Sequence, residues 1–228
     1  TIYNESNSGG VFRQWSKGIK AASGDLVWIA ESDDYCDPDF LEVLVQEFLD
    51  ESVLLAYAKT VFVDREQNPL PDGFRYQLLG LPCAHRWLDS HVETAHREVN
   101  LALGIKNTIP NASGVVFRRP PGMALLDDPH WLAMRVAGDW VFYLNLICGG
   151  KIAFCDSTNN YFRRYQGSTA EAAYSQEYFY REAGMASLTV ARLYDVPISI
   201  HEQSRQIFLK LFHHNVQQDE EKFDEWYG

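Results

Sequence analysis

The sequence predicts an α/β fold, in which a mixed, mostly parallel sheet is flanked by helices and followed by a helical extension. Apolar residues recur at helical spacing over residues 11–22, and a short continuous apolar run follows at residues 26–30. A second helix over residues 37–48 and a second strand over residues 53–62 repeat this order. Such alternation of helix and strand is typical of α/β proteins.

The boundaries of these first elements carry local signals. The polar turn at residues 7–10 precedes the first helix, and Ser23-Gly24 ends it. The run at residues 26–30 has polar residues on both sides, which predicts a strand buried on both faces, as in a parallel sheet. Asp37 and Pro38 then cap and start the second helix.

The middle of the chain is less regular. We expect a helix over residues 86–98 and a strand over residues 113–117, which Arg119-Pro120-Pro121 ends. A helix over residues 140–147 has Asp139 in its first turn. Two further strands are expected at residues 152–155 and 160–163.

The C-terminal part differs in character from the rest. Its apolar residues fall at helical spacing in two segments that Pro197 separates, and a charged tail follows. We therefore expect two parts: an α/β core over residues 1–170 and a helical extension over residues 171–228.

Composition excludes several classes of function. The 228 residues are 46% hydrophobic and 22% charged, which is ordinary for a packed protein. The 20 basic and 31 acidic residues give a net charge of −11, so we expect no nucleic-acid partner and no attraction to an anionic membrane surface. No apolar run approaches the ~18 residues of a membrane span. The four cysteines form no CxxC pair, which favours reduced thiols and a cytoplasmic location.

An acidic turn at residues 31–34 (Glu-Ser-Asp-Asp) is the sharpest feature of the sequence. It places three carboxylates directly after the predicted strand at residues 26–30, where open α/β sheets bind their ligands. Carboxylate oxygens suit Mg²⁺ or Mn²⁺, which can bridge to the phosphates of a substrate. A solvated acidic turn that caps the next helix is the alternative, and spacing alone does not decide between the two.

These segments together resemble family 2 glycosyltransferases of the GT-A fold. The similar parts are Asn-Ser-Gly at residues 7–9, the helix end at residues 18–25, and the acidic turn, where the family usually has Asp in place of Glu31. The resemblance implies a GT-A-like, Rossmann-like sheet, and it makes Asp34 and Glu31 ligands of a divalent metal. It also makes Asn7 and Asp33 contacts of the nucleotide sugar.

Further along the chain, three more segments are similar to the family. Residues 111–119 look like the segment that lines the acceptor side. Residues 137–140 (Ala-Gly-Asp-Trp) resemble the Glu-Asp motif, which makes Asp139 the general base, with Gly138 in place of the preceding acid. A carboxylate that stabilises a helix N-terminus is the structural alternative for Asp139.

The third segment, residues 162–168, resembles the closing Tyr-Arg-x-His-x-Gly-Ser sequence, with Tyr165 in the place of His. Arg163 and Arg164 could hold the diphosphate of a donor. Their alternative is a solvated surface pair. The Gln-x-x-Arg-Trp motif of processive synthases is absent from the sequence, which favours the addition of a single sugar.

The resemblance implies an inverting, metal-dependent, non-processive glycosyltransferase domain. Its partners would be a nucleotide-diphosphate sugar and a glycan or lipid-linked acceptor in cell-surface glycan synthesis, in the cytoplasm or at the inner face of the membrane. A non-catalytic GT-A module for binding or assembly is the alternative. A metal-dependent phosphohydrolase or nucleotidyltransferase is less favoured, because no second carboxylate cluster is seen.

The sequence begins at a point where the family has already formed its first βαβ units. We therefore expect the chain to be an N-terminally truncated catalytic-domain fragment that lacks roughly 60–80 residues, at ~30 residues for each unit, and that can be inactive when isolated. The strand at residues 26–30 would then leave an unpaired sheet edge, through which two copies could form a homodimer.

Overall fold

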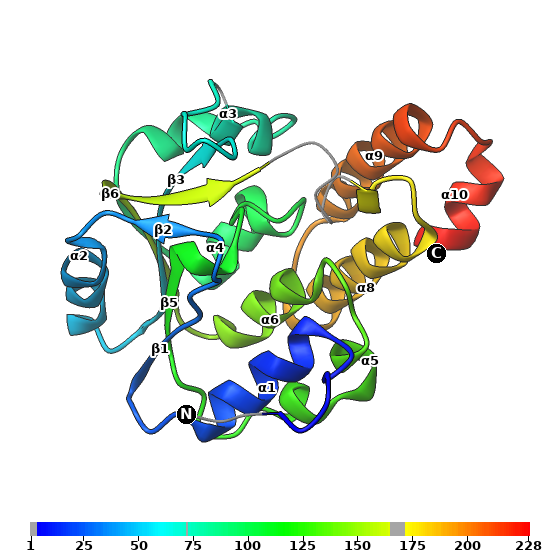
Figure 1. Cartoon of the computed structure of the whole chain (residues 1–228). Coiled ribbons are helices and arrows are strands. Elements are labelled where there is room, and N and C mark those ends of the chain that lie inside the picture. The colour runs from blue at the N-terminus through cyan, green and yellow to red at the C-terminus, as the bar shows by residue number, and fades with distance from the viewer. Residues whose placement is uncertain (1–3, 72, 165–171) are drawn as a thin grey trace.

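The computed structural model describes residues 4–71, 73–164 and 172–228, and it shows one sheet with helices on both faces (Figure 1). Within these residues the sheet has six strands in the order β1-β5-β3-β6-β2, and β4 pairs with β6. The strands are β1 (Leu26–Trp28), β2 (Tyr35–Cys36), β3 (Val53–Val63), β4 (His91–Thr94), β5 (Val115–Arg118) and β6 (Lys151–Arg163). The helices of the core are α1 (Val11–Ala21), α2 (Phe40–Gln46), α3 (Gly73–Gln77), α4 (Ala95–Glu98), α5 (Pro129–Leu132) and α6 (Gly138–Leu146).

The directions of the strands differ in part from the prediction. The α/β, GT-A-like class with a mixed sheet flanked by helices is confirmed, but the expectation of a mostly parallel sheet is wrong. Among the described strands only β3 and β6 pair in parallel, and the other four pairings are antiparallel. Continuous apolar runs report burial on both faces, and they do not determine strand direction.

Strand β3 shows how the two faces of the sheet are covered. Leu55 and Tyr57 point into the larger core, which contains α1 and α6, whereas Ala56 and Ala58 point into a smaller core against α2. Small side chains on the second face let α2 pack close to the sheet, through Phe40 among others. The alternation of large and small residues therefore places the bulkier layer on the side of α6.

The strand predicted at residues 26–30 is shorter and more exposed than expected. Strand β1 ends at Trp28, lies at one edge of the described sheet and pairs with β5 alone. Trp28 is 36% exposed, and its indole N–H donates to the carbonyl of Ser113 at 2.8 Å. The prediction of burial on both faces is therefore wrong for this strand, because an edge position leaves part of its surface without a covering layer.

The helix predicted over residues 86–98 is also wrong. The segment folds as a 3₁₀ turn (Ala84–Leu88), strand β4 and the short helix α4, which Thr94 caps by accepting the N–H of Arg97. Pairing of β4 with β6 decides this outcome, since a local pattern contains no information about that distant partner.

The strands predicted at residues 152–155 and 160–163 are two parts of one strand. In β6 the pairing with β3 passes from Cys155 to Asn159, so that residues 156–158 form a bulge. The bulge explains why the two apolar runs are separated in the sequence although the strand is continuous.

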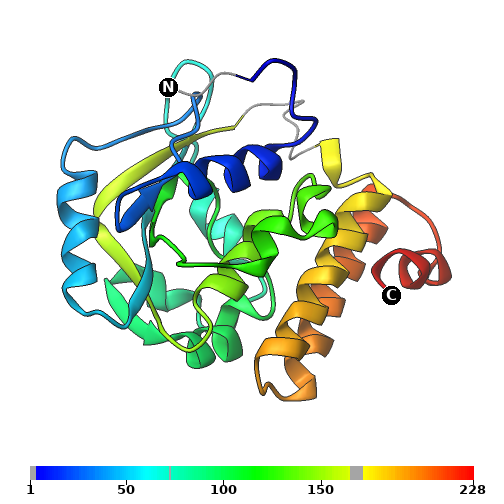
Figure 2. The same cartoon turned by 90° about the horizontal axis from the view of Figure 1, so that it is seen from below.

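Beyond the core, the described residues form α8 (Glu177–Leu193), α9 (Ile198–Asn215) and α10 (Glu220–Tyr227). Helix α8 packs against α6 on one side and against α9 and α10 on the other (Figure 2). Their shared core includes Tyr180, Phe212 and Phe223, each fully buried. The predicted boundary between residues 170 and 171 lies outside the described residues. In the described ranges no helix is both long and apolar enough to cross a membrane.

Candidate functional site

A cavity of about 210 Å³ lies where α1, the acidic turn, the segment before β5 and the start of α6 meet. We call it the acidic pocket, because Glu31 and Asp139 both line it. Its other lining residues are Val11, Phe12, Trp15, Pro110, Asn111, Ala112, Arg135, Val136 and Phe162. The fold therefore brings together two side chains that were predicted to share one site although they lie more than 100 residues apart.

Glu31 is the most perturbed carboxyl of the acidic turn. Burial raises the pKa of Glu31 to about 7, and the charges of Asp34, Asp33 and Asp139 contribute to the rise. Its backbone N–H donates to the hydroxyl of Ser113 at 3.0 Å, which fixes the turn against the segment before β5. Such a crowd of carboxylates binds a cation favourably, because the cation relieves the repulsion among them.

Asp34 is held by a buried chain of amides. One oxygen of its carboxylate accepts the side-chain N–H of Asn111 at 2.6 Å, and the other accepts the backbone N–H of Arg163 at 3.2 Å. Asn111 in turn accepts the amide N–H of Asn160 at 2.7 Å, and both asparagines are buried. Burial nevertheless raises the pKa of Asp34, so these hydrogen bonds do not fully offset its desolvation.

Asp139 lies in the first turn of α6, as predicted. Its carboxylate accepts the N–H of Trp140 at 2.7 Å and the side-chain N–H of Asn107 at 3.0 Å. Burial raises the pKa of Asp139 to about 7, although these bonds oppose the shift. A general base works best when its pKa lies near the pH of the reaction, and burial gives the carboxyl of Asp139 such a pKa. Asp139 is not the N-cap, a position that Ala137 occupies without a side-chain bond.

Packing against α1 explains why the residue before Asp139 is glycine. A Cβ atom at Gly138 would lie 2.4 Å from the ring of Phe12. Real Cβ contacts do not occur at that distance, so α1 and α6 can approach this closely only with glycine there. The space that an acidic side chain would need at position 138 is therefore filled by an aromatic ring from α1.

The C-terminal helices also reach the site. The carboxylate of Glu182, on α8, accepts three backbone N–H groups: that of Arg135 at 2.7 Å, and those of Val136 and Ala137 at 2.8 Å each. These three residues directly precede α6. Glu182 therefore fixes the segment that leads to Asp139, and its charge also raises the pKa of Asp139.

The other predicted site residues occupy different places. Asn7 is exposed before α1, where its side chain accepts the N–H of Gly9 at 2.9 Å, and it does not line the acidic pocket. Asp33 is exposed in the acidic turn. Arg163 contributes its backbone to Asp34, while its buried Nε has no hydrogen-bond partner. Arg164 lines a second cavity. Residues 165–168 of the predicted closing segment lie outside the described residues.

The acidic turn is the expected site of a divalent metal. In the described ranges no group of three His, Cys, Asp or Glu side chains is placed to hold an ion alone. Mg²⁺ is commonly held by one or two carboxylates and completed by phosphates and water. Glu31 and Asp34 fit that mode, because a carboxylate oxygen has two lone pairs and can accept a hydrogen bond and face an ion at the same time.

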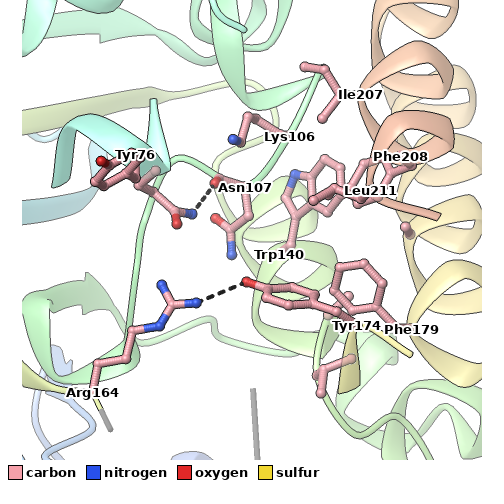
Figure 3. A pocket seen from close by; sticks show the side chains of 14 residues that line it. Tyr76, Lys106, Asn107, Trp140, Arg164, Tyr174, Phe179, Ile207, Phe208 and Leu211 are labelled. Atoms are coloured by element: carbon pink, nitrogen blue, oxygen red, sulfur yellow. Dashed lines mark hydrogen bonds between the residues drawn. The ribbon is translucent and has the colours of Figure 1, made fainter. Parts of the chain in front are cut away.

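The second cavity, of about 280 Å³, lies between the core and helices α8 and α9 (Figure 3). We call it the aromatic pocket. The rings of Tyr76, Trp140, Tyr174 and Phe179 line it together with Lys106 and Arg164. It adjoins the acidic pocket, since Val136 lines both cavities. Its remaining lining residues are Gln77, Asn107, Ala137, Ala183, Ile207, Phe208 and Leu211.

Four residues that shape the site were not predicted from the sequence. Asn111 lies in a segment that resembles the family, so its neighbourhood was recognised but its bond to Asp34 was not. Asn107, Lys106 and Glu182 belong to no motif. Only their burial and their distant partners reveal them, and a single sequence shows neither.

The fold and the two adjoining cavities define a GT-A-like protein with carboxylates at its sheet edge. Residues 1–103 match the family model described as glycosyl transferase family 2, which confirms the resemblance found in the sequence for this part of the chain. Among curated proteins, no relative matches the chain.

Solved structures of TarS from S. aureus share the fold. For TarS 1-349 in complex with UDP-GlcNAc the TM-score is 0.60 at 17% identity, covering 98% of this chain and 60% of that one. For TarS 1-349 in complex with UDP the TM-score is 0.54 at 16% identity, covering 98% and 59%. For a longer TarS chain the TM-score is 0.55 at 18% identity, covering 92% and 32%. The chain thus spans at most about three fifths of the TarS chains it matches.

Proposed function

We propose that the chain is a glycosyltransferase domain that transfers a sugar from a nucleotide-diphosphate donor to an acceptor hydroxyl. The observation that carries the proposal is the acidic pocket, where Glu31 of the acidic turn and Asp139 of α6 face one cavity. The family match over residues 1–103 supports the same reading. UDP-GlcNAc is the first donor to test, because one TarS structure of this fold was solved with it.

In this proposal the carboxylates divide the work. Asp34 and Glu31 would hold a divalent cation, Mg²⁺ or Mn²⁺, which when bound neutralises the diphosphate leaving group. Asp139 accepts the proton of the acceptor hydroxyl as that oxygen attacks the anomeric carbon from the face opposite the diphosphate, which inverts the anomeric configuration. Asn107 holds the carboxylate of Asp139 in place, at 3.0 Å.

The remaining parts of the proposal concern the product. Transfer of one sugar at a time is proposed, because the processive motif is absent from the sequence. The proposed acceptor is a glycan or a lipid-linked molecule, and the proposed process is cell-surface glycan synthesis.

The test combines donor binding with turnover. Calorimetry with UDP-GlcNAc and other nucleotide sugars, with and without Mn²⁺, measures binding, and release of the nucleotide measures transfer or hydrolysis. Asp139→Asn should reduce turnover at least ~10²-fold, the usual contribution of a positioned base, and leave donor affinity unchanged. Asp195→Asn, at an exposed position between α8 and α9, is the matched control. If no donor in the panel binds, the alternative of a non-catalytic module replaces this proposal.

A further inference from the structure

We infer that the aromatic pocket is a ligand site of its own, which binds the acceptor through an anionic group, a phosphate or a carboxylate, placed between Lys106 and Arg164. The term acceptor rests on the proposed function, whereas recognition of the anion does not. The ligand would be a sugar or polyol that carries its negative charge close to its hydroxyl groups.

Two cations of the aromatic pocket have no carboxylate partner among the described residues. Lys106 and Arg164 approach the pocket from different sides (Figure 3). Neither forms an ion pair with a carboxylate in the part of the chain that the structure describes.

Both cations are also partly desolvated. The Nζ atom of Lys106 donates to the carbonyl of Leu79 at 3.3 Å, and burial lowers the pKa of Lys106 to about 8. The guanidinium of Arg164 donates to the hydroxyl of Tyr174 at 3.4 Å and lies 5.8 Å from the ring centre of Phe62. Partly buried cations without a counter-ion are costly, and an anion bound between them offsets that cost.

The wall of the pocket is a rigid aromatic surface. Trp140 stacks on Phe208 with ring centres 6.0 Å apart, and its indole N–H donates to the carbonyl of Leu103. Phe179 continues this surface. Aromatic walls pack well against the C–H faces of sugars and polyols, while the few polar groups set the orientation.

The aromatic pocket lies beside the proposed base. Asn107 lines the aromatic pocket and donates to Asp139, which lines the acidic pocket. The segment from Val136 to Asp139 therefore separates the two cavities. Asn107 is therefore the residue through which a ligand in the aromatic pocket would come next to Asp139.

One competing occupant is the diphosphate of the donor, for which Arg164 was predicted from the sequence. The geometry disfavours it, because Arg164 and Lys106 line the aromatic pocket and neither lines the acidic pocket, to which Glu31, one of the two proposed metal ligands, belongs. The experiment below therefore also measures whether Lys106→Met weakens the binding of UDP.

The test compares matched pairs of small ligands by NMR titration. Glycerol 3-phosphate is compared with glycerol, and glucuronate with glucose, which separates phosphate from carboxylate recognition. We expect the charged member of at least one pair to bind ~10-fold or more tightly than its neutral partner, as two charge-assisted contacts allow. Lys106→Met and Arg164→Met should each remove most of that difference, and Lys106→Arg should retain it. Lys210→Met, at an exposed position on α9, is the control of equal charge change.

Thermal melting of every variant shows whether it is folded. If Lys106→Met does not fold, Arg164→Met and Lys106→Arg still test whether the preference for charged ligands depends on these two cations. The inference is overturned if charged and neutral ligands bind alike, or if Lys106→Met weakens UDP binding as much as binding of the small anions. Donor binding is measured in separate titrations. A protein that binds the anions here and no nucleotide sugar would retain this inference and lose the proposed function.

Discussion

Replacement of Glu182 by glutamine removes one carboxylate oxygen from a position where both oxygens are used. One oxygen accepts the N–H of Arg135, and the other accepts those of Val136 and Ala137. Glutamine has a single acceptor oxygen, so it can satisfy one side only and must turn its NH₂ group toward the N–H on the other side. Glu182→Gln is therefore not a conservative change at this position.

The magnitude follows from the three bonds. A hydrogen bond to a charged acceptor contributes about 1.5–3 kcal/mol, so loss of one side predicts a decrease of about 2 kcal/mol in the free energy of unfolding. Glu182→Ala loses all three, which predicts about 4 kcal/mol if water replaces part of the loss at Arg135, an exposed residue. For a protein of this size, about 2 kcal/mol corresponds to a decrease of about 4–8 °C in the melting temperature.

Urea unfolding and thermal melting measure these changes, with Glu202→Gln, at an exposed position on α9, as the control. Turnover should also fall, by ~10-fold or more, with donor affinity unchanged, because a loosened segment 135–137 misplaces the base. A variant Glu182→Gln whose free energy of unfolding lies within about 0.5 kcal/mol of the parent would refute the reasoning, since that is the usual range of an inert surface change.

Four further expectations follow from the site and the sheet. The parent should lose stability relative to Asp139→Asn as the pH rises from about 4 to about 7. The folded pKa of Asp139, about 7, exceeds the unfolded value of about 3.9, so the native state of the parent binds the extra proton between these values. Unfolding at several pH values checks this, and equal slopes for the two proteins would contradict it. Gly138→Ala should destabilise by about 1–3 kcal/mol through its contact with Phe12, and Phe12→Leu in the same chain should recover part of the loss in a melting experiment. Asp34→Asn should weaken Mn²⁺-dependent binding of UDP in calorimetry, and unchanged affinity would remove Asp34 from the metal site. The edge strand β1 should allow a homodimer to form, and light scattering that shows a monomer at high concentration would exclude it.

Parts of the site could be predicted because their chemistry is local in the sequence. The acidic turn combines carboxylates with a preceding apolar run, and Asp139 precedes an apolar helix. Both features are therefore visible in a short stretch of residues. Their meeting in one pocket followed from the resemblance to a family.

Other parts depend on contacts that local patterns do not encode. Glu182 bonds to residues 45–47 positions away, and no motif marks such a distance. The segment of β4 has a helical pattern, and its partner β6 lies far along the chain. The direction of the strands could not be predicted for a similar reason: burial on both faces produces the same apolar run in parallel and antiparallel neighbours. The structural role of Gly138 likewise depends on Phe12 of a different helix.

The number of residues in the bulge of β6, residues 156–158, matters for both pockets. Beyond it, Asn160 bonds to Asn111, Phe162 lines the acidic pocket and Arg164 lines the aromatic pocket. Asn160 and Phe162 are two apart and so lie on one face of β6, and Arg164, the first residue after the strand, continues the same spacing. If a deletion or insertion in the bulge is transmitted along the strand, an odd number of residues turns all three away from both cavities together, whereas an even number leaves an equivalent set in place. The parity of a short segment that touches no ligand would thereby decide whether both pockets keep their residues, and natural length variation at this position should run in steps of two.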